Sequence, residues 1–148
     1  MTDTTENTLS IFDICETDTT AEEDGRWFRD IFNDGTNIDV KLRRLLSNAS
    51  LNVRRRLDSG YRKYHKNGVY KDEAMGIRVL NEQLAEAVLI DWKGIKVREG
   101  DAMVELPYSK ENALNLLTKL RHFRDTVLVM SQTLDNFRVE AREETAKN

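Results

Sequence analysis

The sequence predicts an α+β domain that is mainly α-helical, with a small N-terminal β-hairpin followed by a bundle of about four helices. Three observations predict this fold class. First, the turn signal Asn33-Asp34-Gly35 is followed by apolar residues at alternate positions. Second, Ser47, Asp72 and Ser109 can each cap a helix, and apolar residues follow each of them at helical spacing. Third, a chain of 148 residues with 39% hydrophobic and 33% charged residues supplies one core rather than two.

Residues 1–24 form an acidic leader, which we expect to be disordered. They contain eight acids and no base, and their apolar cluster, Ile11-Phe12 with Ile14-Cys15, is too small to offset the entropy cost of ordering the chain. The alternative is that residues 9–14 dock on a partner or on a groove of the domain itself. Residues 25–140 are predicted to form a single folded domain, and residues 141–148 a frayed, charged tail.

The N-terminus has neither the basic region nor the apolar region of a secretory signal, and no run of about 18 apolar residues is present. Cys15 is the single cysteine, so there is no disulfide framework and no cysteine-based zinc site. We therefore expect a protein of a reducing, cytoplasmic setting. The net charge of −3 is unevenly spread, because residues 41–71 carry ten bases against one acid, Asp58.

The predicted hairpin spans residues 25–42. Beyond its turn, Ile38, Val40 and Leu42 alternate with polar residues, which gives the second strand one apolar face. That face must pack on the helices or on another chain, because two strands alone are marginally stable in water. An open edge here is also able to accept a partner strand.

Two helices are predicted to follow the hairpin. The first begins after the capping side chains of residues 47–50 and is expected to end near Asn67-Gly68. The second begins after Asp72 and is expected to run to Asp91. Residues 87–90 of this helix are apolar nearly all round, which is typical of a buried helix end.

Residues 93–106 are predicted to form a loop or a short hairpin with apolar residues facing one another. The facing residues are Ile95 and Val97 on one side and Val104 and Leu106 on the other. Pro107 stops any helix from continuing through this segment, and Ser109 caps the next one. Helical spacing then continues to Phe137, with a bend expected near residues 119–122 and one continuous helix as the alternative.

No constellation of residues indicates catalysis, a metal site or a cofactor site. The histidines, His65 and His122, have no cysteine or carboxylate at ligand spacing. Glu82, Glu86 and Asp91 lie near one another, but no nucleophile, glycine-rich phosphate loop or oxyanion site accompanies them. We therefore expect a non-enzymatic protein without a cofactor, in which Asp91 accepts backbone or arginine hydrogen bonds.

A group of basic residues interleaved with tyrosines forms a candidate basic surface. Its members are Arg54, Arg55, Arg62, Lys63 and Lys66. Such a footprint is typical of a nucleic-acid binder, so a small nucleic-acid-associated regulator is the alternative function. However, successive residues such as 54–56 span about 300° of a helix and do not form one stripe. A solvated face or a surface for an acidic protein partner is therefore the favoured interpretation.

A resemblance is carried by several stretches in order, after a strand-like opening with tryptophan and a basic helix. These stretches are Asn81-Glu82-Gln83-Leu84-Ala85-Glu86-Ala87-Val88-Leu89-Ile90-Asp91-Trp92-Lys93-Gly94, Pro107-Tyr108-Ser109-Lys110-Glu111-Asn112-Ala113, Phe123-Arg124-Asp125-Thr126-Val127 and Asn136-Phe137. Over roughly residues 25–140 the chain resembles the tail assembly chaperones of long-tailed bacteriophages. It departs from them in lacking a proline near residues 119–123.

The resemblance implies that the protein acts by binding. Such chaperones associate with the long, helical, aggregation-prone tape measure protein in the host cytoplasm, help to recruit tail tube subunits, and are absent from the finished virion. Amphipathic helices suit that role because they can cover apolar stripes on a client. We expect Leu84, Val88 and Trp92 in the core. The candidate client-binding residues, for which a core position is the favoured alternative, are Tyr108, Leu116, Leu120 and Phe123.

Members of this family are often made in two lengths through a −1 ribosomal frameshift. Ala146-Lys147-Asn148 can be encoded GCA-AAA-AAC, which contains the slippery run A-AAA-AAC. We therefore expect this chain to be the short form, and tail tube subunits to bind through a longer form that shares its first residues. A non-slippery codon choice without an overlapping downstream frame would contradict this hypothesis.

Overall fold

A computed structural model describes residues 8–139 of the chain. Its helices are α1 (Ile11–Cys15), α2 (Thr19–Asp24), α3 (Asn48–Gly60), α4 (Glu73–Gln83), α5 (Lys110–Lys119) and α6 (Arg121–Gln132). Its strands are β1 (Arg26–Phe28), β2 (Asp39–Leu42), β3 (His65–Lys66), β4 (Val69–Tyr70), β5 (Leu89–Lys93), β6 (Lys96–Glu99) and β7 (Ala102–Glu105). Short 3₁₀ segments are η2 (Arg62–Tyr64) and η4 (Leu134–Phe137), and η3 (Leu84–Val88) is a π-helical turn. The predicted fold class, a mainly helical α+β domain, is confirmed.

The centre of the molecule is a three-stranded antiparallel sheet in the order β1-β2-β5. Strands β1 and β2 form the predicted N-terminal hairpin, in which Phe28 pairs with Val40. The connecting loop is held by Asp30, whose carboxylate accepts hydrogen bonds from the backbone N–H groups of Gly35 (3.3 Å) and Asn37 (3.2 Å). Strand β5 covers the other edge of β2, so the open edge expected on the second strand is filled by the chain itself.

The prediction of a helix running to Asp91 is wrong. The helix α4 begins after Asp72 as predicted but ends at Gln83, and the π turn η3 then leads into β5. Periodicity alone cannot separate a short, fully apolar helix end from a buried strand. The hydrogen bonds offered by β2, which lies about 50 residues away in the sequence, decide the outcome.

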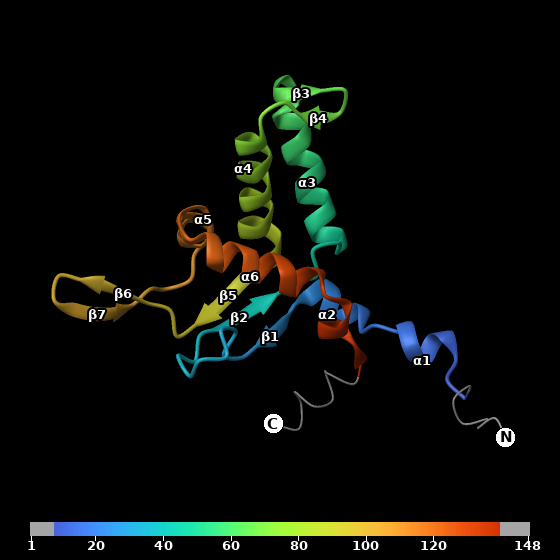
Figure 1. The fold of residues 1–148 in the computed structure, drawn as a ribbon, viewed down its shortest axis with the longest axis horizontal. Coiled ribbons are helices and arrows are strands. Elements are labelled where there is room, and N and C mark those ends of the chain that lie inside the picture. Colours follow the sequence, from blue (N-terminus) through green and yellow to red (C-terminus); the bar gives the residue numbers. More distant parts are fainter. Residues whose placement is uncertain (1–7, 140–148) are drawn as a thin grey trace.

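Helices α3 and α4 project from the sheet as an antiparallel pair, and the short hairpin β3–β4 lies at their outer end (Figure 1). We call residues 48–83 the helical arm. Ser47 caps α3 as predicted, accepting a hydrogen bond from the Ser50 N–H. The prediction that this helix reaches Asn67-Gly68 is wrong, because both residues have positive φ and form the turn of the hairpin.

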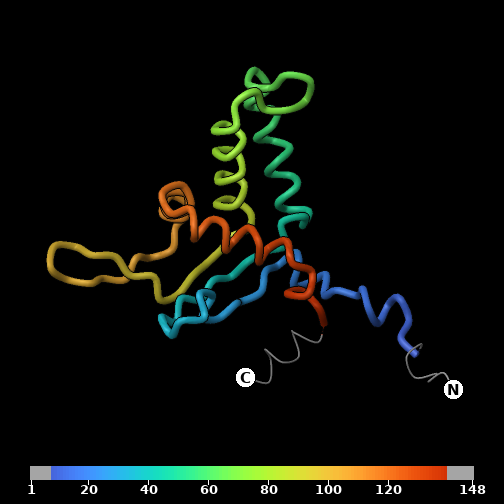
Figure 2. Tube along the Cα trace, viewed as in Figure 1, coloured from blue at the N-terminus to red at the C-terminus, as the bar shows by residue number. Residues whose placement is uncertain are grey.

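Strands β6 and β7 form the predicted short hairpin, in which Val97 pairs with Val104. This hairpin extends away from the sheet on another side of the molecule, as the Cα trace in Figure 2 shows. Ser109 caps α5, and its hydroxyl accepts a hydrogen bond from Asn112 N–H at 3.0 Å. The predicted bend is confirmed at Leu120, which has extended backbone angles between α5 and α6 and needs no proline.

The core lies where the sheet, the π turn η3 and helices α5 and α6 meet. Leu84, Val88 and Trp92 are buried in it, as predicted. The other buried hydrophobic residues of this cluster are Val40, Leu42, Ala85, Leu89, Ile95, Ala113, Leu116, Leu117, Phe123 and Val127. A chain segment that changes from helix to strand therefore supplies the centre of the core.

The expectation of a disordered leader is wrong for residues 8–24. Helix α2 packs against the domain with Asp18, Ala21 and Glu22 buried. Arg44 pairs with Glu22 at 2.7 Å, so residues far along the chain neutralise acids of the leader, which composition alone does not reveal. The predictions for residues 1–7 and for the tail at 141–148 lie outside the described residues.

Candidate binding surfaces

The candidate client-binding residues lie at different depths. Leu116 is 9% exposed and Phe123 is 5% exposed, so both belong to the core, whereas Leu120 is 49% exposed at the bend between α5 and α6. Tyr108 is half-buried. In this conformation, Leu120 is the member of the set that a client can contact fully.

Tyr108 and Trp92 fix the segment between β7 and α5. The Tyr108 hydroxyl donates a hydrogen bond to the Leu89 carbonyl at 2.7 Å, and Trp92 Nε1 donates one to the Leu106 carbonyl at 2.8 Å. The rings meet edge to face, with centroids 5.1 Å apart. Burial, and after it the nearby Asp91 carboxylate, raises the pKa of Tyr108. These contacts assign both aromatic side chains a structural role.

Asp91 accepts a hydrogen bond from the Trp92 backbone N–H at 2.8 Å, as the sequence predicted. Beside it, a hollow of ≈ 650 Å³ opens at the base of the β6–β7 hairpin. Trp92 and Tyr108 form its aromatic wall, and Lys93 and Glu105 stand at its rim. The hollow therefore offers an apolar floor between opposite charges.

The candidate basic surface is divided by the structure. Arg54 lies within the arm and donates hydrogen bonds to Asp58 on its own helix (3.0 Å) and to Gln83 on α4 (3.1 Å). Arg55 is exposed and donates a hydrogen bond to Asn52 in the preceding turn of α3. The remaining members, Arg62, Lys63 and Lys66, are exposed together at the outer end of the arm. Of the five candidate residues, these three share one end of the arm.

The outer end of the arm is held by Tyr70. Its hydroxyl donates a hydrogen bond to Asp58 at 2.6 Å, and its ring meets His65 with centroids 4.1 Å apart. Burial, and then the hydrogen bond to Asp58, raises the pKa of Tyr70 to about 12. His65 thus packs against an aromatic ring, as does His122, which lies 5.1 Å from the Phe32 ring.

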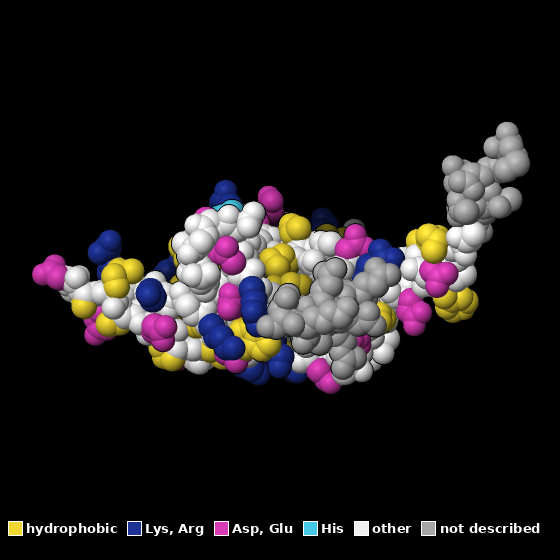
Figure 3. Space-filling model, turned by 90° about the horizontal axis from the view of Figure 1, so that it is seen from below, with side chains coloured by type: hydrophobic (Ala, Val, Ile, Leu, Met, Phe, Trp, Pro, Cys, Tyr) yellow, Lys and Arg dark blue, Asp and Glu magenta, His cyan; other side chains and the backbone are white. Residues whose placement is uncertain are grey.

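Helix α1 and the residues before it carry an exposed apolar surface, which the sequence predictions gave only as an alternative to disorder. Its large apolar side chains are mostly exposed, Phe12 the most at 73%. We define the leader patch as Leu9, Ile11, Phe12 and Ile14. The patch is part of the segment considered as a docking element, and the capping box between Ser10 and Asp13 is the sequence signal for its helix. Figure 3 shows hydrophobic and acidic side chains together on this extension.

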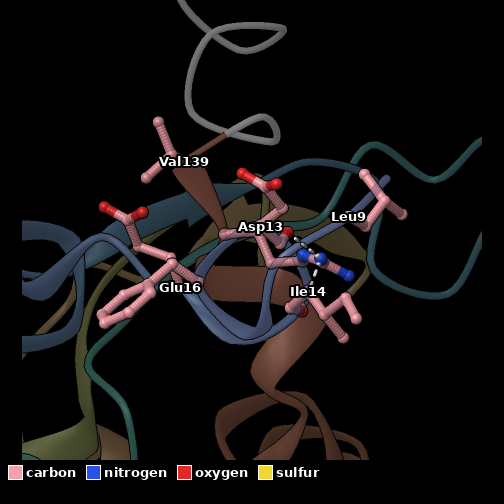
Figure 4. A pocket seen from close by; sticks show the side chains of 7 residues that line it. Leu9, Asp13, Ile14, Glu16 and Val139 are labelled. Atoms are coloured by element: carbon pink, nitrogen blue, oxygen red, sulfur yellow. Dashed lines mark hydrogen bonds between the residues drawn. The ribbon is translucent and has the colours of Figure 1, made fainter. Parts of the chain in front are cut away.

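The leader patch borders a hollow of ≈ 740 Å³. Leu9, Ile14 and Val139 contribute apolar walls, as Figure 4 shows. Arg138 holds α1 there, because its guanidinium donates hydrogen bonds to the carbonyl oxygens of Ile14 (2.7 Å) and Asp13 (3.3 Å). Helix α1 is therefore attached to the C-terminal segment, but its apolar side chains remain open to solvent.

Between residues 8 and 139, no group of histidine, cysteine and carboxylate side chains has the arrangement of a metal site. Over the same range, no helix has the length and apolar character to cross a membrane.

Comparison with known proteins gives a family but no close relative. A family model described as YdaY prophage protein matches residues 45–148, which includes the arm, the π turn, β5 and all later elements. A search of curated proteins and a search of solved structures each gave no significant match. Because the family model covers well over half of the chain, the protein is phage-derived and belongs to the YdaY prophage protein family.

Proposed function

We propose that the protein is a non-enzymatic phage tail assembly chaperone. In this role it binds the tape measure protein in the host cytoplasm, helps to recruit tail tube subunits through a longer frameshifted form, and is absent from the finished virion. Its phage origin supports the proposal, as does the resemblance carried by residues 81–113. That stretch builds the centre of the core, so it specifies the fold that presents the binding surfaces.

The observation that carries the proposal is the distribution of exposed apolar side chains over projections from a small core. Phe12 projects on α1, Val69 at the end of the arm and Met103 on the β6–β7 hairpin. Leu120 adds a further exposed position at the α5–α6 bend. Scattered apolar side chains are ordinary, but large ones on extended elements suit contact with a long client.

Co-expression with the long, helical tape measure protein of the same phage tests the proposal. The soluble fraction of the tape measure protein should rise several-fold with the wild-type chain, because bound chaperone covers apolar stripes that otherwise aggregate. Leu120→Asp should reduce this effect. Thr118→Asp places the same charge on a neighbouring exposed position of α5 and serves as the control. A client that is equally insoluble with and without the wild-type chain contradicts the proposal.

The rival function is a nucleic-acid-associated regulator, and one observation favours it. Arg62, Lys63 and Lys66 are exposed together beside Tyr64, whose ring Lys63 approaches at 5.2 Å. Gel retardation on duplex DNA over a salt series distinguishes the two functions. The rival requires binding at ordinary salt with a slope near −0.9 per phosphate contacted. A chaperone should give no retardation under the same conditions.

A further inference from the structure

We propose that the leader patch of one molecule docks on the outer end of the helical arm of a second copy. We call residues 61–71 the arm tip. The contact would pair an exposed apolar, acidic element with an exposed basic element of the same protein. This inference is independent of the tail chaperone function.

The leader patch exposes apolar side chains that the described part of the chain leaves uncovered. Its side chains are between 51% and 73% exposed, although they lie on an ordered helix with a capping box. In sequence, residues 1–7 and 140–148 contain no apolar residue larger than alanine except Met1. Contiguous exposed apolar side chains on a positioned element mark an interaction site.

Charge selects the kind of partner. The 24 residues of the leader contain eight acids and no base, and two of these acids, Asp18 and Glu22, are buried and paired with arginines. The six others would make two leaders repel one another. Glu16 is exposed beside the patch, and Asp13 lies at its centre. The surface that covers the patch should therefore be basic around an apolar centre.

The arm tip has these properties. Residues 61–71 contain four bases and no acid. Val69 is 66% exposed there and pairs with Lys66 across the hairpin, and the Tyr64 backbone carbonyl accepts a hydrogen bond from the Lys71 N–H at 2.9 Å. The hydrogen bond from Tyr70 to Asp58 fixes the hairpin on α3. A surface ordered before binding loses less conformational entropy when it binds.

The two elements cannot meet within one molecule. Helix α1 and the arm tip extend from different sides of the sheet in Figures 1 and 2, and residues 17–26 fix the leader to the body. A contact between unlike surfaces leaves the tip of one molecule and the patch of the other unused, so it builds chains or closed rings. Because the patch is small, the contact should be weak, with Kd on the order of micromolar or above.

Sedimentation velocity of the full chain tests the association. At low salt the mean mass should rise with concentration up to several hundred micromolar, and about 0.5 M salt should return it to that of the monomer by screening. A mass that stays at that of the monomer at every concentration overturns the proposal. So does self-association that salt does not weaken.

A complementation experiment tests which surfaces meet. Phe12→Asp replaces the most exposed side chain of the patch with a charge, and Lys63→Glu with Lys66→Glu cancels the net charge of the tip by leaving two bases and two acids. All three side chains are exposed, and circular dichroism verifies folding. Each variant alone should be monomeric, and an equimolar mixture should form a 1:1 dimer and nothing larger. Val129→Asp, an exposed position on α6, is the control and should associate as the wild type does.

The proposal fails if the tip variant still self-associates while the leader variant does not, since that result indicates pairing of leader with leader. It also fails if the mixture of the two variants remains monomeric.

Discussion

At the scale of residues, two aromatic side chains hold the segment between β5 and α5 by donating hydrogen bonds to backbone carbonyls. The acceptor of Trp92 is 14 residues away and that of Tyr108 is 19 residues away in the sequence. The apolar spacing identified Trp92 as a core residue, but no local pattern specifies which carbonyl each ring reaches. Those partners depend on the strand β5, which periodicity did not reveal.

Tyr108→Phe removes the hydroxyl that donates to the Leu89 carbonyl. The free energy of unfolding should fall by about 1 kcal/mol, because a partly buried acceptor loses its hydrogen bond while the ring packing against Trp92 remains. Urea denaturation measures the change. Tyr64→Phe, at an exposed ring on the arm tip, is the control and should leave stability nearly unchanged. Equal effects of the two substitutions would contradict the structural role of Tyr108.

Because of Tyr70, part of the free energy of unfolding should be lost as pH rises into the alkaline range. Its pKa is raised to about 12 from an ordinary value of 10.0, mainly by burial and then by the hydrogen bond to Asp58. Since the folded state holds this proton more tightly, the contribution is fully present below about pH 10 and is lost as pH rises from about 10 through 12.

Urea denaturation at about pH 9 and about pH 11 measures this dependence. The wild type should lose more free energy of unfolding between these two pH values than Tyr70→Phe does. Comparison with the variant cancels the other groups that titrate in the same range. Identical losses in the two proteins would show that Tyr70 is not responsible.

At the scale of elements, capping side chains were the most reliable guide. Ser47, Asp72 and Ser109 each begin a helix as predicted, because the hydrogen bond from a nearby N–H is a local property. Helix ends were less predictable. The turn Asn67-Gly68 belongs to a hairpin, and the helix expected to reach Asp91 changes into a strand, since both outcomes depend on partners from elsewhere.

Gly94 is required where β5 leaves the sheet. It has φ +81°, and a Cβ atom added there would overlap the carbonyl oxygen of Asn37. Gly94→Ala should therefore lower the free energy of unfolding by roughly 3 kcal/mol or more, from left-handed strain of about 1–2 kcal/mol and the clash. Gly100 also has a positive φ, but a Cβ atom added there meets no atom within 4 Å. Gly100→Ala should therefore cost only the left-handed backbone strain. Thermal denaturation compares the stabilities of the two variants. Equal losses of stability would contradict the close approach of the Asn37 carbonyl to Gly94.

At the scale of the whole molecule, the two ends of the described chain are joined by a buried arginine. Arg26 is 6% exposed and donates hydrogen bonds to the carbonyls of Asn136 (2.7 Å) and Arg138 (3.1 Å), with Asp18 at 3.5 Å. Composition shows a basic residue at the start of the hairpin and acids in the leader, but not the hydrogen bonds from Arg26 to carbonyls 110 and 112 positions away. This pairing explains why the leader is ordered up to the body.

Arg26→Met should lower the free energy of unfolding by about 3–5 kcal/mol, because it leaves a buried carboxylate and carbonyl groups without this donor. Chemical denaturation measures the loss, and limited proteolysis should cut first within residues 8–24. Arg98→Met, an exposed position on β6, is the control and should change stability by less than about 0.5 kcal/mol. A loss as small as that of the control would contradict the proposed attachment of the leader.

Function at this scale rests on the phage origin, the resemblance and the projecting elements together. The burial of Leu84, Val88 and Trp92 was predicted correctly, although the helix expected to carry this segment ends at Gln83. The helical form of the leader patch was not, because a leader with so few apolar residues is expected to be disordered. Binding surfaces of this kind become visible only once the fold shows which apolar residues the core leaves out.

Deletion of the gene from a phage that carries it tests the proposed function most directly. After infection or induction, electron microscopy of the lysate counts filled heads and completed tails. The tail chaperone function predicts normal numbers of filled heads, a loss of completed tails by at least about tenfold, and recovery when the wild-type chain is supplied from a plasmid. Normal numbers of completed tails in the deletion would contradict it.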